Sequence, residues 1–245
     1  MKLNLVQDTR YTYDSPVRFS TQYLRLTPRD TTRQKVLEWK LETPGQPLRT
    51  SDGYGNVLHV LTLDKPFSEI RIKAAGLIET SPTVDEPSDF TGVALSPLLF
   101  LRITALTRAD EGLAAFAEGF RRRAGTLSGL RELAAAVQKK LPDAGPEAQA
   151  HAFIASCRLL GIPARYVSGY ACVSKSPLQV EPHAWAEAWV VDRWRSFDIA
   201  HNTPVGEGHV KVAIGADYSD ACPIRGVRTG GGAETMQAKS QVQAQ

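Results

Sequence analysis

The strongest chemical signal in the sequence is a short alternating segment that contains a histidine and a glutamate. In the segment HAWAEAW, a histidine, two tryptophans and a glutamate occupy every second position, with alanines between them. Strict alternation of this kind predicts a β-strand with two different faces. One face carries His183, Trp185, Glu187 and Trp189, whereas the alanine face permits close packing of a helix.

A carboxylate in the next predicted strand, residues 194–199, is placed to meet the histidine. With a connection of about four residues between the strands, Asp198 would lie opposite Trp185 and diagonal to His183, roughly 7 Å away between backbones. Such a pair can fix the tautomer of the imidazole and stabilise the imidazolium while a nucleophile is activated. Polar pairs between neighbouring strands are also common structural contacts, so the residues alone leave both interpretations open.

The elements that precede these strands fall into two kinds. Residues 1–80 are short alternating apolar runs separated by Pro, Gly and Asp, which predicts an antiparallel β domain, a sandwich or barrel. Residues 51–56, SDGYGN, are typical of a turn between two of its strands. Residues 81–106 begin with a stretch rich in Pro, Ser and acidic residues, and we interpret them as a linker.

The periodicity becomes helical after this linker. Residues 107–228 contain three helical patterns followed by strands, which indicates an α+β fold. The third helix is expected to begin at Gly145 and Pro146, because proline suits the first helical turn, and to end before Gly161. Residues 229–245 are a glycine run and a Gln-rich stretch, for which a last strand and a disordered tail both remain open.

Composition and charge exclude several classes of protein. A chain of 245 residues that is 42% hydrophobic can bury a sizeable core, which excludes a disordered or fibrous protein. The net charge of +3 is spread along the chain and argues against a nucleic-acid partner. No apolar run is long enough for a signal sequence or a membrane span, so no membrane association is expected. Three widely spaced cysteines fit a reducing compartment, and we expect a cytoplasmic protein.

Metal binding is the remaining chemistry that the histidines suggest. His151, His183, His201 and His209 are not joined by the His-x-His or His-x-x-x-His spacing that places two ligands on one element. The sequence therefore predicts neither a metal nor a cofactor.

Three ordered motifs give the chain a resemblance to a known family. The segments are GIPARYVSGY at 161–170, PHAWAEAWV at 182–190 and RSFDIAHN at 195–202, and they resemble the core of bacterial transglutaminase-like proteins. Residues 12–29 and 51–63 resemble the N-terminal β domain of this family, and residues 212–232 its C-terminal segment. The resemblance implies an N-terminal antiparallel β-sandwich followed by a transglutaminase-like, cysteine-protease-like α+β core.

The resemblance also implies roles for site residues. Active members are Cys-His-Asp enzymes in which a cysteine at a helix N-terminus attacks an amide carbonyl, and by position His183 matches the base and Asp198 the orienting carboxylate. Relatives open the helix with a Gly-x-Cys-Gln-Asp type of sequence before Ala-His, but here the sequence is GPEAQ, so Pro146 occupies the place of the nucleophile. Ala216 replaces an arginine that is usual in the family, and residues 139–145 form a shorter connection.

None of the three cysteines is an evident replacement. Cys157 falls on the apolar stripe of the third helix, about 16 Å from its start, and is expected to be a packing thiol. Cys172 lies on a strand that could approach His183, but it would lack the helix dipole that lowers a thiol pKa. Cys222 falls in the C-terminal segment, where the family has ordinary small residues.

These observations favour a catalytically inactive homologue over an active enzyme. We expect it to bind a peptide or protein partner through the vestigial cleft, with Trp185, Glu187 and Trp189 as binding residues. The alternative is an active cysteine-dependent acyl transferase or amide hydrolase that uses a displaced cysteine with His183 and Asp198. A purely structural role in an assembly is the third possibility, and the oligomeric state is not predicted.

Overall fold

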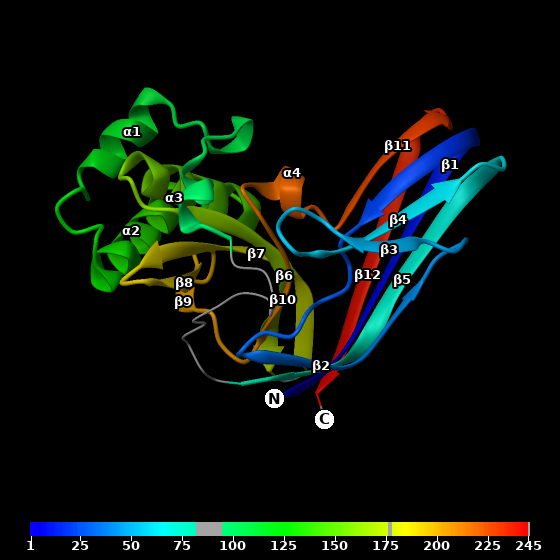
Figure 1. The fold of residues 1–245 in the computed structure, drawn as a ribbon, viewed down its shortest axis with the longest axis horizontal. Helices are drawn as coiled ribbons and strands as arrows, with labels where there is room; N and C mark the ends of the chain where they lie inside the picture. The colour runs from blue at the N-terminus through cyan, green and yellow to red at the C-terminus, as the bar shows by residue number, and fades with distance from the viewer. Residues whose placement is uncertain (82–94, 176–177, 245) are drawn as a thin grey trace.

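The computed structural model describes residues 1–81, 95–175 and 178–244 (Figure 1). The acidic part of the expected linker, residues 82–94, lies outside these described ranges. The first half of the chain contains β1 (Lys2–Leu24), β2 (Gln34–Glu42), β3 (Leu48–Ser51), β4 (Val57–Leu63), β5 (Phe67–Thr80), and the short 3-10 helices η1 (Pro97–Leu101) and η2 (Ala105–Thr107). It is followed by α1 (Glu111–Glu118), α2 (Leu127–Lys140), α3 (Pro146–Leu159), β6 (Ala164–Lys175), β7 (Leu178–Val190), β8 (Arg193–Asp198), β9 (Thr203–Pro204), β10 (His209–Gly215), α4 (Tyr218–Ala221), β11 (Ile224–Gly230) and β12 (Glu234–Ala244).

The strands form two antiparallel sheets, which we call the outer sheet and the core sheet. The outer sheet has the strand order β2-β5-β1-β4-β3, with β11 and β12 also paired to β1. The core sheet has the order β10-β6-β7-β8-β9. In Figure 1 the core sheet lies between the helices α1 to α3 and the outer sheet, so it is covered on both sides. Mixed helices and antiparallel strands give the α+β class that the sequence predicted.

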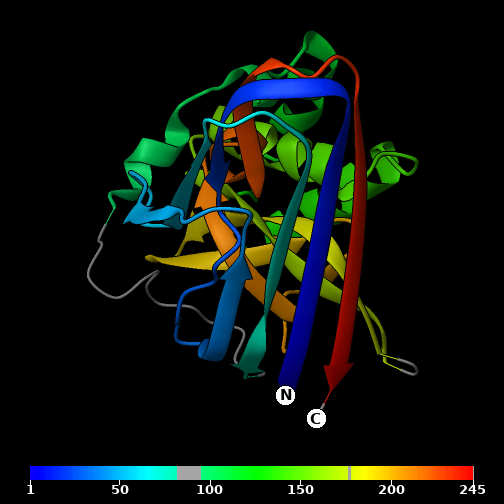
Figure 2. The ribbon, with the colours of Figure 1, turned by 90° about the vertical axis from the view of Figure 1, so that its right-hand side faces the viewer.

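The last strands of the chain belong to the sheet that contains the first strand. β12 pairs with β1 from Leu3 opposite Ala244 to Tyr13 opposite Glu234, and β11 pairs with the second half of β1. Figure 2 shows β1 and β12 running side by side toward the two chain ends. Residue 228 lies within β11, and both β11 and β12 have β1 as their partner.

Helix α3 packs on the alanine face of β7, as the alanine spacing predicted. Ala184, Ala186 and Ala188 share one buried cluster with Phe153 and Ile154 of the helix. The helix begins at Pro146, the expected position. The preceding helices are capped by side chains, since Asp110 accepts a hydrogen bond from the backbone of Leu113 at 2.7 Å and Thr126 caps α2 in the same way. α1 ends at Glu118.

None of the helices in the described ranges combines the length and the apolar character that a membrane crossing requires.

A buried ionic cluster joins three neighbouring strands of the core sheet, β10, β6 and β7. Arg165 of β6 and Glu187 of β7 are direct cross-strand partners, and Arg165 Nε donates to Glu187 Oε2 at 2.7 Å. Lys211 of β10 places its Nζ 2.8 Å from the other carboxylate oxygen. All three side chains are almost completely buried, and the guanidinium of Arg165 lies over the ring of Trp194 at 3.9 Å. One carboxylate therefore pairs with two cations inside the sheet.

A second buried cation attaches the 3-10 segments to the core. Arg158 of α3 donates from Nε to the carbonyl of Phe100 at 2.9 Å and from Nη1 to the hydroxyl of Thr107 at 2.7 Å. Its Nη2 donates to the carbonyls of Ala164 at 2.8 Å and Ala216 at 2.6 Å. One guanidinium thus donates hydrogen bonds to η1, η2, the start of β6 and the segment before α4.

Removal of the negative charge at the centre of the ionic cluster should be strongly destabilising. We expect Glu187→Gln to lower the free energy of unfolding by about 3–5 kcal/mol, because it removes the buried carboxylate that both Arg165 and Lys211 contact. Urea unfolding of this variant should be compared with Glu181→Gln, an exposed position on the same strand. A loss below about 1 kcal/mol, the size of a surface pair, would contradict the structural role of the cluster.

The same cluster predicts how stability depends on pH. Burial acts to raise the pKa of Glu187, but the charges of Arg165 and Lys211 outweigh burial and hold its pKa below the ordinary value. The contribution of the carboxylate to stability is therefore present above the ordinary pKa of a glutamate and is lost as the pH falls toward the folded-state value. This acid-induced loss should be smaller in Glu187→Gln than in the unchanged protein.

Candidate active site

Three histidines surround one oxygen of Asp198, and we call these four residues the Asp198 cluster. His201 Nδ1 lies 2.7 Å, His209 Nε2 2.9 Å and His183 Nε2 3.0 Å from Asp198 Oδ2. The other oxygen, Oδ1, accepts a hydrogen bond from the backbone N–H of His201 at 3.1 Å. The carboxylate side chain is fully buried, whereas that of His201 is 43% exposed. A single buried anion therefore organises three imidazoles.

Local structure explains why these residues meet. Ala186 of β7 is opposite Phe197 of β8, so Asp198, the last residue of β8, follows in line with Trp185 and diagonal to His183. This is the arrangement that the strand spacing predicted. His201 lies in the turn that follows β8, and His209 is the first residue of β10.

The hydrogen bonds determine the protons of two of the imidazoles. A carboxylate can only accept, so His201 Nδ1 and His209 Nε2 must each carry a hydrogen toward Asp198. His209 Nδ1 accepts the backbone N–H of Gly206 at 3.2 Å and is therefore not protonated. His209 is thus the neutral tautomer with its hydrogen on Nε2. Burial also lowers the pKa of His209 below its ordinary value, although the hydrogen bond to Asp198 acts in the opposite direction.

His183 differs from the other two histidines. Its Nε2 is close to Asp198, but no aligned hydrogen bond satisfies this atom. Its side chain is only 4% exposed, and its ring lies 4.8 Å from that of His201 between centroids. Burial acts to raise the pKa of Asp198, but the surrounding imidazoles outweigh burial and keep its pKa far below the ordinary range. His183 therefore faces a permanently ionised carboxylate, which is the environment of a general base with its orienting partner.

The start of α3 and His183 line a common cavity of about 280 Å³, which we call the α3 cavity. Pro146 and Glu147 enter it from the first turn of the helix, and Tyr166 and Tyr170 from β6. The outer sheet supplies the opposite wall, with Tyr11, Met236 and Ala238. Burial raises the pKa of Glu147 above its ordinary value. The residue in the nucleophile's expected place thus shares a cavity with His183 but offers no reactive group.

The expected binding residues do not line this cavity. Trp185 is fully buried in a cluster with Val167, Val205 and Ile214. Glu187 belongs to the buried ionic cluster described above. Trp189 is half-buried and packs edge-to-face on Trp194 at 5.5 Å between ring centroids. His183 thus lines the α3 cavity, whereas Trp185, Glu187 and Trp189 pack against other residues away from it.

The three cysteines form no disulfide, and none is among the residues that line the α3 cavity. Cys157 is completely buried in the core, and burial raises the pKa of its thiol. Cys222 is buried after α4 and donates from Sγ to the carbonyl of Ile224 at 3.1 Å. Cys172 is half-buried and packs against the cluster formed by Leu3, Leu5 and other apolar residues of both sheets.

The Asp198 cluster also contains the group of described residues that could hold a metal ion. One atom each of His183, Asp198 and His201 lie within 4.8 Å of one another. The separations of 2.7 to 3.0 Å between nitrogen and oxygen are those of hydrogen bonds.

Comparison with known proteins supports the fold and the family. Residues 3–79 match the model of the bacterial transglutaminase-like N-terminal region, and residues 115–199 match that of the transglutaminase-like superfamily. The chain is 28% identical to an uncharacterized protein of Mycobacterium leprae, with 96% of each chain covered. It is 26% identical to an uncharacterized protein of Mycobacterium tuberculosis, covering 89% of this chain and 85% of the relative. A crystal structure of a proposed cysteine protease from Cytophaga hutchinsonii superposes with a TM-score of 0.73 at 21% identity, covering 100% and 91% of the two chains.

The proton assignment at His209 can be tested directly. Nitrogen-15 NMR of the imidazole rings should show His209 as the Nε2–H tautomer, and it should remain neutral as the pH falls below about 6.5. Because the unfolded chain takes up a proton there first, the free energy of unfolding should decrease as the pH falls through this range. His209→Gln should remove part of that decrease. A protonated His209 at neutral pH would contradict the assignment.

Proposed function

Because the chain belongs to the transglutaminase-like superfamily, we propose that it is a catalytically inactive member that binds a peptide or protein partner through the α3 cavity. The observation that carries this proposal is Pro146 at the first position of α3, in the same cavity as His183.

Proline at this position removes two chemical functions at once. A thiol at a helix N-terminus beside an imidazole is a nucleophile because both neighbours favour the thiolate, and proline has no such group. The backbone N–H of a nucleophile is also a common donor to the oxyanion of the tetrahedral intermediate. Proline carries no N–H, so this donor is missing as well.

Other side chains of the cavity do not replace the nucleophile. Ser168 lines the α3 cavity, but its hydroxyl donates to the carbonyl of Ala221 at 2.7 Å and is 5% exposed. The cysteines lie elsewhere in packed surroundings. Their lack of disulfides also supports a reducing location such as the cytoplasm.

The chemistry of the cavity favours an apolar side chain as its occupant. Most of its wall is aromatic or aliphatic, and a volume of about 280 Å³ is suited to one or two side chains. Glu147 places a carboxyl at the same wall and can pair with a basic group that follows the inserted residue. We therefore propose a peptide segment with an apolar residue beside a basic one.

The first prediction of this proposal concerns thiol reactivity. A brief, limiting iodoacetamide pulse near pH 6 should label none of the three native cysteines rapidly. Pro146→Cys should create a thiol that reacts at least about tenfold faster than that of Ala148→Cys, an exposed control on the same turn. Adding His183→Ala should abolish the difference, because the imidazole favours the thiolate.

Two results would contradict the inactive assignment or the role of position 146. Rapid, His183-dependent labelling of Cys157, Cys172 or Cys222 would show a displaced nucleophile and contradict the inactive assignment. Slow labelling of Pro146→Cys would show that position 146 is not the place that the base serves.

The second prediction concerns binding. Peptides selected from a random displayed library on the unchanged protein should bind at least about tenfold more weakly to Ala238→Trp, which fills the cavity from the outer sheet. Gln237→Trp is the matched control, because it places the same side chain on the opposite face of β12. Equal binding to both variants would exclude the α3 cavity as the peptide site.

A further inference from the structure

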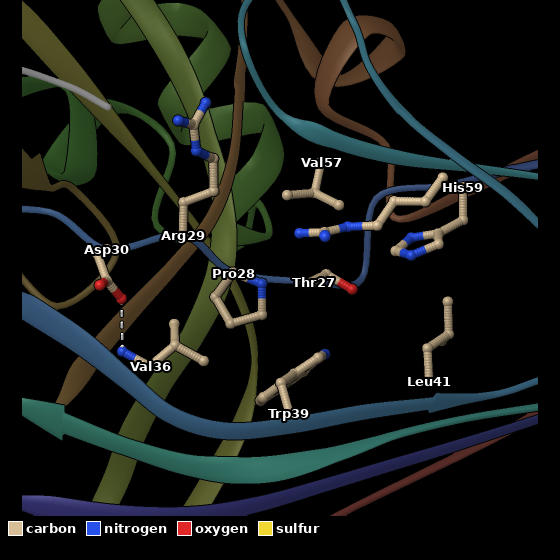
Figure 3. Close-up of a pocket in the computed structure, with 10 residues that line it drawn as sticks. Thr27, Pro28, Arg29, Asp30, Val36, Trp39, Leu41, Val57 and His59 are labelled. Atoms are coloured by element: carbon tan, nitrogen blue, oxygen red, sulfur yellow. Dashed lines mark hydrogen bonds between the residues drawn. The ribbon is translucent and has the colours of Figure 1, made fainter. Parts of the chain in front are cut away.

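A second cavity, of about 570 Å³, lies within the outer-sheet region and apart from the Asp198 cluster. We call it the β2–β4 pocket because these strands supply two of its walls. Figure 3 shows Trp39 and Leu41 on the β2 side, Val57 and His59 on the β4 side, and Thr27 and Pro28 between them. Its volume is in the range of sites for small organic ligands.

Unpartnered polar atoms are concentrated in this pocket. Trp39 Nε1, Thr27 Oγ1 and His59 Nδ1 are all buried, and none has a hydrogen-bond partner. Buried polar groups nearly always have a hydrogen-bond partner, and a buried group that forms no hydrogen bond costs about 1–3 kcal/mol of stability. His59 is more than nine-tenths buried. Three such atoms along one cavity are therefore the mark of a ligand that completes their hydrogen bonds.

The chemistry of these atoms specifies what the ligand must offer. The indole Nε1–H of Trp39 can only donate, and a threonine hydroxyl can donate as well as accept. Burial, reinforced by the charge of Arg49, lowers the pKa of His59, so its ring is neutral and can present a hydrogen on Nδ1. The pocket thus offers one obligatory donor, the Trp39 indole N–H, and two groups that can also donate, so a ligand with acceptors satisfies all three.

A cation completes this set. Arg49 of β3 is the direct cross-strand partner of His59, lines the pocket, and forms no hydrogen bond or ion pair within the described residues. Arg29 also lines the pocket and donates to the carbonyl of Gly55. The carboxylate of Asp30 accepts a hydrogen bond from the backbone N–H of Val36 at 2.8 Å. Arg49 thus places a positive charge at the pocket that an anionic ligand can meet.

We infer that the β2–β4 pocket binds a carboxylate with an apolar body, the carboxylate meeting Arg49, Thr27 and the Trp39 indole. A guanidinium fork matches the two oxygens of a carboxylate. The apolar body would pack on Trp39, Leu41 and Val57. Both a free organic acid and the C-terminus of a peptide carry this chemistry.

The test uses N-acetyl-phenylalanine as the acid and N-acetyl-phenylalanine amide as its uncharged match. The protein has four tryptophans, and the indole N–H signal of Trp39 is identified by its loss in Trp39→Phe. In a nitrogen-15 correlation spectrum the acid should shift this signal downfield, because an unpartnered N–H gains an acceptor. The amide should bind at least about tenfold more weakly.

Variants separate recognition from folding. Arg49→Gln, at an exposed position, should weaken binding of the acid about tenfold or more and leave the binding of the amide unchanged. Arg18→Gln, an exposed arginine of β1 outside the pocket, should bind the acid like the unchanged protein. Equal affinity for acid and amide, an unmoved Trp39 signal, or inorganic phosphate binding without the acid would each overturn the inference.

A further arm distinguishes the two sources of the carboxylate. A short peptide that ends in phenylalanine should bind more tightly than the N-acetylated amino acid if the natural ligand is a peptide C-terminus. Equal or weaker binding identifies a free acid. Because the β2–β4 pocket shares no lining residue with the α3 cavity, these results are independent of those from Ala238→Trp.

Discussion

The buried carboxylate of Glu187 is the constraint on which the arrangement of the core sheet depends. It lies between Arg165 and Lys211 and thereby joins β7 to the strands on which those cations lie. Two buried cations without this carboxylate would be far more costly than the same cations paired with it. Because strands alternate their faces, a slip of one residue would remove Glu187 from Arg165 and turn His183 to the alanine side. The position of the His183 imidazole therefore depends on the ion pair between Glu187 and Arg165, because Glu187 lies four residues farther along the same strand.

Beside this frame lies the Asp198 cluster, which faces the start of α3 across the α3 cavity. Asp198 holds three imidazoles, and two of them already have their protons committed to it. His183 remains close without an aligned hydrogen bond. Opposite it, the first residue of α3 is a proline, which supplies neither a thiol nor an N–H. In the inactive member that we propose, these residues form the scaffold of a base without a nucleophile.

The sequence predicted some of this arrangement and could not predict the rest. Alternation placed Asp198 near His183, and the Gly145–Pro146 pair located the start of α3, because both are local rules of strand and helix geometry. His201 could have been found from its spacing in the turn after Asp198. His209 could not, since only the pairing of β10 with β6 brings it near. Alternation also shows that Trp185 and His183 share a face without showing which part of that face is covered, and Val205 and Ile214 cover Trp185.

The pairing of β1 with β12 has a consequence for the order in which the chain can fold. Leu3 is matched with Ala244, a separation close to the full length of the chain. Closing contacts of such high sequence separation is slow because the intervening chain must first lose much of its freedom. During synthesis on the ribosome, one edge of β1 must therefore wait for its partner strand until β12 has emerged. In the meantime the unpaired edge of β1 is open to association with other chains.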